Sequence, residues 1–233
     1  EIGSGLVGSE MCIRDRSNPY DNRDPRMKYT IVCNEMKWPV DPVEIWEGGT
    51  NGLPLQNATT TGYYLKKYVN NTISFEAGST VTKKQHNWVL FRYGEILLNY
   101  AEAMINAFHD PNYKDAVYNM SAREAVNQIR GRTNISLPGF PSDITEKDFV
   151  KRLKNERRVE LAFEGHRFWD VRRWKELGQT ANIYGVKITK NNEVISYEKF
   201  LLETRAVTDN MYFYPIPNTE RFKNPNLGQN PGW

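Results

Sequence analysis

Apolar residues recur every three or four positions over much of the second half of the chain, which is the period of amphipathic helices. Ser121 stands three residues before Glu124, the spacing of a capping box that starts a helix. Thr145 is a second candidate cap, and Gly165 suits the left-handed conformation that ends a helix. The pattern therefore predicts four helices, over residues 88–108, 121–132, 145–165 and 166–178.

The predicted helices carry their apolar side chains on stripes that should face a core. In the first helix the stripe consists of Val89, Tyr93, Ile96, Leu97, Tyr100 and Met104. In the second helix it consists of Ala122, Ala125, Val126 and Ile129. Three tryptophans also fall in helical stripes and are predicted to belong to the core, namely Trp88, Trp169 and Trp174.

Outside the helices the pattern predicts short extended segments and long loops. Residues 29–32 and 61–69 are predicted strands, and the polar turn "TKNNE" predicts a hairpin between Val186–Ile188 and Val194–Ile195. Residues 34–62 combine prolines and glycines with tryptophans, which predicts a long irregular loop of the kind that often carries function. The fold class that follows is mainly helical, with long loops and a few short strands or hairpins.

Composition narrows the class of protein. The chain has 233 residues, of which 39% are hydrophobic and 12% aromatic, and a formal net charge of +3. Basic residues are interleaved with acidic ones, so no basic stripe predicts binding to nucleic acid. No apolar run reaches the length of a membrane span, and phosphate-binding loops and nucleophile elbows are absent. We therefore expect no cofactor and no catalytic residue.

The first residues differ from the rest of the chain. "EIGSGLVGSEMCIRDRS" begins without Met and lacks periodicity, and "LVGSEMCIRDR" resembles the translated read-through of a sequencing adapter. We expect residues 1–17 to be a non-native or disordered leader and residues 18–233 to be the C-terminal part of a larger domain. Cys12 and Cys33 have no metal-ligand spacing, and a disulfide between them stays open. The histidines are scattered, so no metal site is predicted.

The stretch "NERRVELAFEGHRFWDVRRW" places Glu156, Glu160 and Glu164 four residues apart, in one row of a helix. Paired carboxylates are what glycoside hydrolysis requires, so a glycosidase that uses Glu160 and Glu164 is one hypothesis. Arginines surround the row, however, and a guanidinium fork keeps a carboxylate ionised, which makes it a poor proton donor. We interpret the row as a structural ion-pair network that holds helices together.

Several motifs in order resemble the SusD/RagB family. They are "RDPR", "TGYYLKKY", "RYGEILLNYAEA", "VNQIRGRT", "NERRVELAFEGHRFWDVRRW" and "YPIP" followed by "NPNLGQNPGW". The resemblance implies a SusD-like helical scaffold with tetratricopeptide-type helix pairs. It also implies a surface-exposed outer-membrane lipoprotein of Bacteroidetes without catalytic activity, whose lipid anchor at the mature N-terminus is absent from this fragment. Such a protein delivers captured oligosaccharides to a SusC-like TonB-dependent transporter. Peptide capture on the same scaffold is the alternative.

The resemblance also assigns roles to residues. The RDPR, GE and ERR segments resemble scaffold motifs, and with the neighbouring charges they make up the expected ion-pair network: Asp24, Arg26, Arg92, Glu95, Glu156, Arg157, Arg158, Glu160, Glu164, Arg167 and Asp170. Loops with aromatics and amides bind ligand in the family, which makes Trp38, Trp46 and Asn51 the candidate ligand-binding residues. Two other interpretations stay open: that these tryptophans only pack the loop onto the helices, and that the whole chain is a structural scaffold without a ligand.

Overall fold

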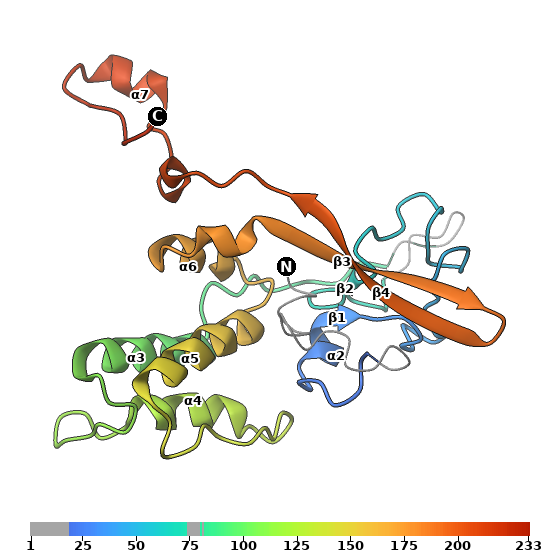
Figure 1. The fold of residues 1–233 in the computed structure, drawn as a ribbon, viewed down its shortest axis with the longest axis horizontal. Coiled ribbons are helices and arrows are strands. Elements are labelled where there is room, and N and C mark those ends of the chain that lie inside the picture. The colour runs from blue at the N-terminus through green and yellow to red at the C-terminus, as the bar shows by residue number, and fades with distance from the viewer. Residues whose placement is uncertain (1–18, 74–79, 81) are drawn as a thin grey trace.

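The computed structural model describes residues 19–73, 80 and 82–233, so the expected leader and Cys12 lie outside the described part. Six α-helices and four β-strands form within it, a helical fold with few strands that confirms the predicted class (Figure 1). The elements are α2 (Met27–Thr30), β1 (Ile31–Val32), β2 (Tyr64–Leu65), α3 (Tyr93–Phe108), α4 (Ala122–Arg130), α5 (Glu146–Glu160), α6 (His166–Arg173), β3 (Asn182–Asn191), β4 (Val194–Thr204) and α7 (Asn218–Lys223), with 3₁₀ turns η1 (Leu177–Thr180) and η2 (Asp209–Tyr212).

Helices α3, α4 and α5 pack together on one side of the molecule (Figure 1). The predicted stripe of α4 is fully buried, and Phe149 and Leu153 of α5 join it in one apolar cluster. The predicted caps are confirmed as well. Ser121 Oγ accepts from the Glu124 amide at 3.2 Å while the Glu124 carboxylate accepts from the Ser121 amide at 2.8 Å, and Thr145 Oγ1 accepts from the Asp148 amide.

The prediction that the first helix begins at residue 88 is wrong, because α3 begins at Tyr93. Arg92 is fully extended, with φ −148° and ψ 162°, and its guanidinium reaches the end of α5. The predicted stripe of α3 is confirmed at Leu97 and Met104 but is wrong at its first three positions. Val89, Tyr93 and Ile96 are exposed, and the residues that enter the core are Leu97, Leu98, Ala101, Met104 and Ile105.

The prediction that one helix runs over residues 145–165 is also wrong at its end. Helix α5 stops at Glu160, and a turn follows in which Phe163 has φ +64° and Gly165 has φ +81°. Gly165 is left-handed, as predicted, but it directly precedes α6. Glu164 therefore lies in the turn, so only Glu156 and Glu160 share a helix.

The predicted strand over residues 29–32 is half helix. Residues Met27–Thr30 form the short helix α2, because the Met27 amide bonds to the Asp24 carbonyl at 2.9 Å and the Thr30 hydroxyl bonds to the Arg26 carbonyl at 2.7 Å. Only Ile31 and Val32 extend, and they pair antiparallel with Leu65 and Tyr64, the strand part of the predicted segment 61–69.

The predicted hairpin is present and is longer than the sequence suggested. Strands β3 and β4 pair antiparallel from Asn191↔Val194 back to Asn182↔Thr204. The irregular loop over residues 34–62 lies against this hairpin, with bonds from Glu47 N to Ile188 O at 3.0 Å and from Val186 N to Thr61 O at 3.0 Å. The residues buried between them form a second apolar cluster, of Val32, Val43, Ile45, Ile188 and Tyr197.

The three helical tryptophans are not core residues. Trp88 lies before α3 and is 83% exposed, because the helix that would have carried it begins five residues later. Trp169 is 60% exposed, since α6 buries only Asp170 and Val171. Trp174 is half-buried and donates from Nε1 to Glu102 at 2.8 Å. Among the described residues no helix is both long and apolar enough to span a bilayer.

Candidate functional site

The carboxylate row lies at the end of α5 and in the turn that follows it. Side-chain exposure is 2% for Glu156, 3% for Glu160 and 8% for Glu164, so all three carboxylates are removed from water. A buried carboxylate is stable only when cations or hydrogen-bond donors compensate its charge. The partners of this row therefore decide whether it can act as an acid or base.

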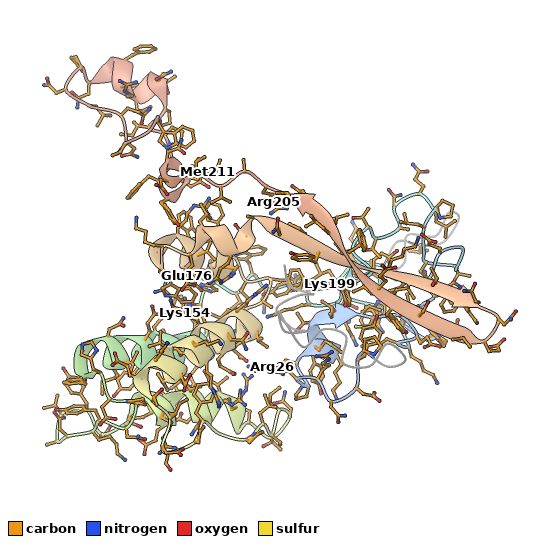
Figure 2. All side chains as sticks on the ribbon, in the orientation of Figure 1. Arg26, Lys154, Glu176, Lys199, Arg205 and Met211 are labelled. Atoms are coloured by element: carbon orange, nitrogen blue, oxygen red, sulfur yellow. The ribbon has the colours of Figure 1, made fainter. Side chains whose placement is uncertain are left out.

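Arg26 connects the two glutamates of α5 to the N-terminal part of the chain. Its Nη1 donates to Glu156 Oε1 at 2.6 Å and to Glu160 Oε2 at 2.9 Å, across 130 and 134 residues of sequence. Its other edge holds Asp24 as a bidentate pair, at 2.9 and 2.6 Å. Arg26 thus lies between α5 and the segment around α2 (Figure 2). Its guanidinium joins two parts of the fold.

Three further arginines bind the two glutamates of α5. Arg130 of α4 donates to Glu156 Oε2 at 2.6 Å, and Arg132 donates to Glu160 Oε2 at 2.8 Å. Arg92 donates to Glu160 Oε1 at 2.7 Å and to the Glu160 carbonyl at 2.7 Å. Each of the two carboxylates is therefore held by arginines from separate segments of the chain.

Glu164 is held by two cations beyond the end of the helix. Arg92 forms a fork on it, with Nε to Oε2 and Nη2 to Oε1 both at 2.8 Å. Lys67 Nζ adds a bond to Oε1 at 2.6 Å and another to the Ala162 carbonyl at 2.9 Å. These contacts tie the segment after β2 and the start of α3 to the same turn.

A second set of ion pairs joins α5 to α6. Arg157 Nε donates to Asp170 Oδ2 at 2.7 Å, and its Nη1 donates to Asn99 Oδ1 at 2.6 Å. Arg173 donates to Asp170 Oδ1 and also pairs with Glu102 of α3. Asp170 thus accepts from two guanidinium groups while it is itself buried.

The electrostatics of the row disfavour proton donation. Burial alone would raise the pKa of Glu160, but hydrogen bonds from Arg92 and Arg26 outweigh it and lower the pKa to about 2. Burial also opposes ionisation of Glu164, and bonds from Arg92 and Lys67 again lower its pKa. A general acid for glycoside hydrolysis needs a raised pKa, which is the opposite shift.

Two expected members of the network, Glu95 and Arg167, have other surroundings. Glu95 is 3.6 Å from His166 Nε2, and its buried Oε2 has no hydrogen-bond partner among the described residues. Arg158 is half-buried on α5. Arg167 donates from Nη2 to the amide oxygen of Gln179 at 3.1 Å, which is a neutral acceptor and not a carboxylate.

Few side chains that could bind a metal lie close together in the described part of the chain. No group of three or more His, Cys, Asp or Glu side chains gathers there in an arrangement that could hold an ion. Cys33 is a free, buried thiol, and burial raises its pKa to about 12. It stays protonated at neutral pH and is therefore no nucleophile.

The candidate ligand-binding tryptophans lie in the loop over residues 34–62, half-buried against the second apolar cluster. A lysine covers one face of each indole. Lys66 Nζ is 4.7 Å from the ring centroid of Trp38, and Lys190 Nζ is 4.6 Å from a ring centroid of Trp46. Both contacts are cation–π interactions, and they restrict a stacked sugar to the part of each ring that the lysine leaves open.

Asn51 is exposed but engaged within the loop. Its Oδ1 accepts from the Glu44 amide at 3.1 Å and from the Thr50 hydroxyl at 3.2 Å, and its carbonyl accepts from Tyr64 at 2.7 Å. The side-chain NH₂ group of Asn51 makes no bond among the described residues. Asn51 therefore helps to close the loop and retains a donor for a ligand.

The structure adds a pocket that the sequence did not indicate. A pocket of about 230 Å³ lies between the loop and the β3–β4 hairpin. Its walls are mostly apolar, its rim carries threonine hydroxyls and the Glu47–Lys187 ion pair, and its lining residues are Ile45, Glu47, Leu53, Thr59, Thr60, Gly62, Val186, Lys187, Ile188 and Phe200. A Cβ on Gly62 would lie 2.5 Å from the Val186 carbonyl, so glycine there is the one local signal for this close approach.

The amino-acid sequence of this chain is similar to known proteins of one family. A sequence profile of the family described as "SusD family" matches residues 14–233. Two relatives from Formosa agariphila are SusD-like protein P2, 29% identical over 163 residues, and SusD-like protein P38, 37% identical over 150 residues. These alignments cover 67% and 62% of this chain but only 28% and 24% of the relatives.

Solved structures agree with these sequence matches. A SusD-like protein from Bacteroides fragilis has a TM-score of 0.76 at 27% identity, over 93% of this chain and 40% of that one. A SusD homolog from Bacteroides thetaiotaomicron has a TM-score of 0.55 at 22% identity, over 90% of this chain and 41% of that one, and shows the fold alone. The chain thus spans less than half the length of the proteins that it matches.

Proposed function

This chain belongs to the SusD family, and on that premise we propose that it captures oligosaccharides at the cell surface without converting them. Members of the family are generally non-catalytic binding proteins and are typically lipoproteins on the outer-membrane surface. The finer parts of the proposal are a glycan as ligand, a SusC-like TonB-dependent transporter as partner, and a lipid anchor in the full-length protein.

The observation that carries the proposal is the pocket between the loop over residues 34–62 and the β3–β4 hairpin. Sugar rings combine apolar C–H faces with hydroxyl groups, so a site for them needs flat apolar surface next to polar atoms. The pocket has apolar walls from the hairpin and the hydroxyls of Thr59 and Thr60, and Trp46 packs against the apolar cluster to which its lining residues Ile45 and Ile188 belong. These features support a binding role for Trp46 and, further along the loop, for Trp38 and Asn51.

The carboxylate row supports the non-catalytic part of the proposal. Glu160 and Glu164 are the pair that a glycosidase would use, and both are ionised and bound by arginine and lysine. A reaction that needs one neutral acid would have to break this network, and leaving a buried charge unpaired costs about 3–5 kcal/mol. We therefore assign the row to the scaffold and the ligand to the loop.

The test is calorimetric titration of the purified 233-residue chain with a panel of oligosaccharides and, in parallel, with short peptides. Trp46→Ala should weaken oligosaccharide binding about tenfold or more, while Trp46→Phe, which keeps an aromatic face, should weaken it less. Trp88→Ala is the matched control, because Trp88 is exposed and lies outside the loop. Binding of peptides but not oligosaccharides would establish the alternative ligand class.

Hydrolysis is tested on the same samples by chromatography of the glycans after incubation. Intact glycans at the end of the experiment are the expected result. Product formation that disappears in Glu160→Gln, in a protein that keeps its helical circular dichroism, would replace this proposal by a glycosidase. For the partner, a gene for a SusC-like transporter beside the gene for this chain is the expected observation.

A further inference from the structure

A second pocket, of about 300 Å³, lies between α6 and the segment that follows β4. One wall is α6 and η1, and the other is the segment from Arg205 to Met211, which runs from the end of β4 past α6 (Figure 2). Arg172 Nε donates to the Met211 carbonyl at 3.1 Å and fixes the two walls to each other. The pocket is on different elements from the loop site and shares none of its lining residues.

The charge of this pocket is the reason to consider a ligand. Its lining residues include three arginines and no carboxylate: Arg167, Phe168, Val171, Arg172, Leu177, Thr180, Arg205, Ala206, Val207 and Met211. A pocket that concentrates positive charge beside low-dielectric walls attracts anions. Among the arginines of the scaffold, by contrast, Arg26, Arg92 and Arg157 each hold at least one carboxylate.

Arg167 and Arg172 bond only to neutral acceptors within the described part of the chain. Arg172 donates to the carbonyls of Met211 and Phe168, at 3.1 and 2.9 Å, and Arg167 donates to the Gln179 amide at 3.1 Å. Arg167 Nε is buried and makes no hydrogen bond there. A buried donor without a partner is costly, and two guanidinium groups without a counter-charge leave positions for an oxyanion.

The other walls of the pocket indicate what kind of ligand would bear the anionic group. Phe168, Val171, Leu177, Val207 and Met211 supply apolar surface, and the Arg172 guanidinium carbon lies 3.5 Å from the centroid of the Phe168 ring. Arg172 uses Nε and Nη1 on backbone carbonyls, so its Nη2 is the nitrogen left to donate a charge-assisted hydrogen bond to an anion. The pocket therefore suits a compact ligand with an apolar face and one anionic group, at the lower end of the size range for small-molecule sites.

We propose that this pocket binds the carboxylate or sulfate group of an acidic sugar unit in the captured oligosaccharide. The inference rests on the proposed function, because it names the class of glycan that the protein takes. Arg172 and Arg167 bind the oxyanion, and the apolar walls receive the face of the ring, while Arg205 stays paired with Glu203. A neutral oligosaccharide fills the loop site alone, whereas an acidic one is held at both pockets.

The experiment titrates the chain with matched oligosaccharides: a uronic acid oligomer, its neutral counterpart with carboxyl groups reduced to alcohols, and a sulfated derivative of that neutral oligomer. The uronate should bind about tenfold to a hundredfold more tightly than the neutral oligomer, the range expected for charge-assisted hydrogen bonds. The excess should fall as salt is raised, because exposed charges are screened. The sulfated oligomer distinguishes a general oxyanion site from one selective for carboxylates.

Single-residue variants test whether the arginines of this pocket cause the preference for the acidic oligomer. Arg172→Gln and Arg167→Gln should each remove most of the preference for the acidic oligomer and leave neutral binding unchanged. Arg123→Gln is the matched control, since Arg123 is an arginine of α4 that also bonds to neutral acceptors, Asn112 Oδ1 and the Phe140 carbonyl. Arg167→Gln also guards against misfolding, because Arg167 has a single bond to lose whereas Arg172 holds two backbone segments.

Failure of the acidic-sugar inference can be distinguished from failure of the proposed function. Equal binding of acidic and neutral oligomers, unaffected by the arginine variants but lost in Trp46→Ala, would overturn the acidic-sugar pocket and leave glycan capture in place. Absence of binding to all the oligosaccharides would overturn the function itself. Arginine-dependent binding of an acidic peptide with no binding of the uronate would also overturn the inference, in favour of a peptide carboxylate.

Discussion

The helical layer and the loop–hairpin region hold themselves together by different means. Between α3, α5 and the segment around α2, buried arginines and carboxylates connect positions as far apart as Arg26 and Glu160. Between the loop over residues 34–62 and the hairpin, the links include backbone hydrogen bonds, an apolar cluster, Lys190 above the Trp46 ring and one exposed ion pair, Glu47–Lys187. In the first region the charged groups are buried and paired with one another, whereas the second region leaves polar groups exposed at its surface.

This difference is the reason to expect the ligand at the loop and not at the most conspicuous charges of the sequence. A buried ion pair is strongly destabilised when one partner is removed or neutralised, so its residues cannot change protonation state during function. An exposed loop tolerates a bound ligand and small adjustments. Substitutions in the two regions should therefore differ in their cost to stability.

The largest effect is expected at Glu160. Glu160→Ala leaves Arg26, Arg92 and Arg132 without the carboxylate that they share, so the free energy of unfolding should fall by about 3–5 kcal/mol. Chemical denaturation followed by circular dichroism measures it. The exposed pair Lys223–Glu220 of α7 is the control, and Glu220→Ala should cost about 0–1 kcal/mol. Similar losses in both variants would mean that the buried network does not stabilise the helical layer.

Acid should act on the same region. The folded pKa of Glu160, about 2, lies below its ordinary value of 4.5, so its stabilisation is complete above the ordinary pKa and is lost as the pH falls toward 2. The loss of unfolding free energy over this interval should be about 3 kcal/mol from Glu160. The lowered pKa of Glu164 adds to it in the same direction.

The control for the acid effect is Glu160→Gln, which lacks the titrating group. Its unfolding free energy, measured by urea denaturation at a series of pH values, should decline less steeply between pH 5 and pH 2 than that of the unmodified chain. Parallel curves for the two proteins would show that the acid sensitivity arises elsewhere.

A smaller effect is expected at Gly94, whose missing side chain leaves room for an ion pair. A Cβ there would lie 2.7 Å from Arg92 Nη1 and 3.3 Å from Glu160 Oε1. Gly94→Ala should therefore displace the guanidinium and cost about 1–3 kcal/mol. At Gly178 the same change meets no atom within 4 Å, so thermal unfolding of Gly178→Ala should match or exceed that of the unmodified chain.

The smallest effect belongs to the loop. Asn51→Ala removes the side-chain acceptor for the Glu44 amide and the Thr50 hydroxyl, and should cost about 1 kcal/mol because the loop is exposed to competing water. Gln56→Ala is the control, since Gln56 is exposed in the same loop and makes no side-chain bond among the described residues. A loss at Asn51 as large as that at Glu160 would remove the distinction between the two regions.

The start of a helix was predicted correctly where the residues that specify it lie within four positions of one another. Ser121 with Glu124 and Thr145 with Asp148 start α4 and α5 at the expected places. The prediction failed where a distant partner decides the backbone. Arg92 is extended and not helical, and the residue that holds it, Glu164, comes 72 positions later.

The candidate site shows the same division. Arginines near the glutamates indicated that the row would be paired, but most of the partners observed, Arg26, Arg92, Arg130, Arg132 and Lys67, come from other segments of the chain. The loop aromatics could be found from composition, whereas the pockets could not. Each pocket is lined by segments that are far apart in the sequence and come together only in the folded chain. A pattern of residues within one segment cannot predict this contact.

Motifs, helical periodicity and caps act over a few positions, so the family, the helical class and the candidate residues could be predicted from the amino-acid sequence. How those residues are paired and buried follows from the folded chain. Burial and pairing are properties of long-range contact: they lower the pKa of Glu160 and leave Arg167 and Arg172 beside a pocket without a carboxylate. Arginines with the same side chain thus differ in their surroundings, because some pair with a buried carboxylate and others bond to neutral acceptors beside a pocket.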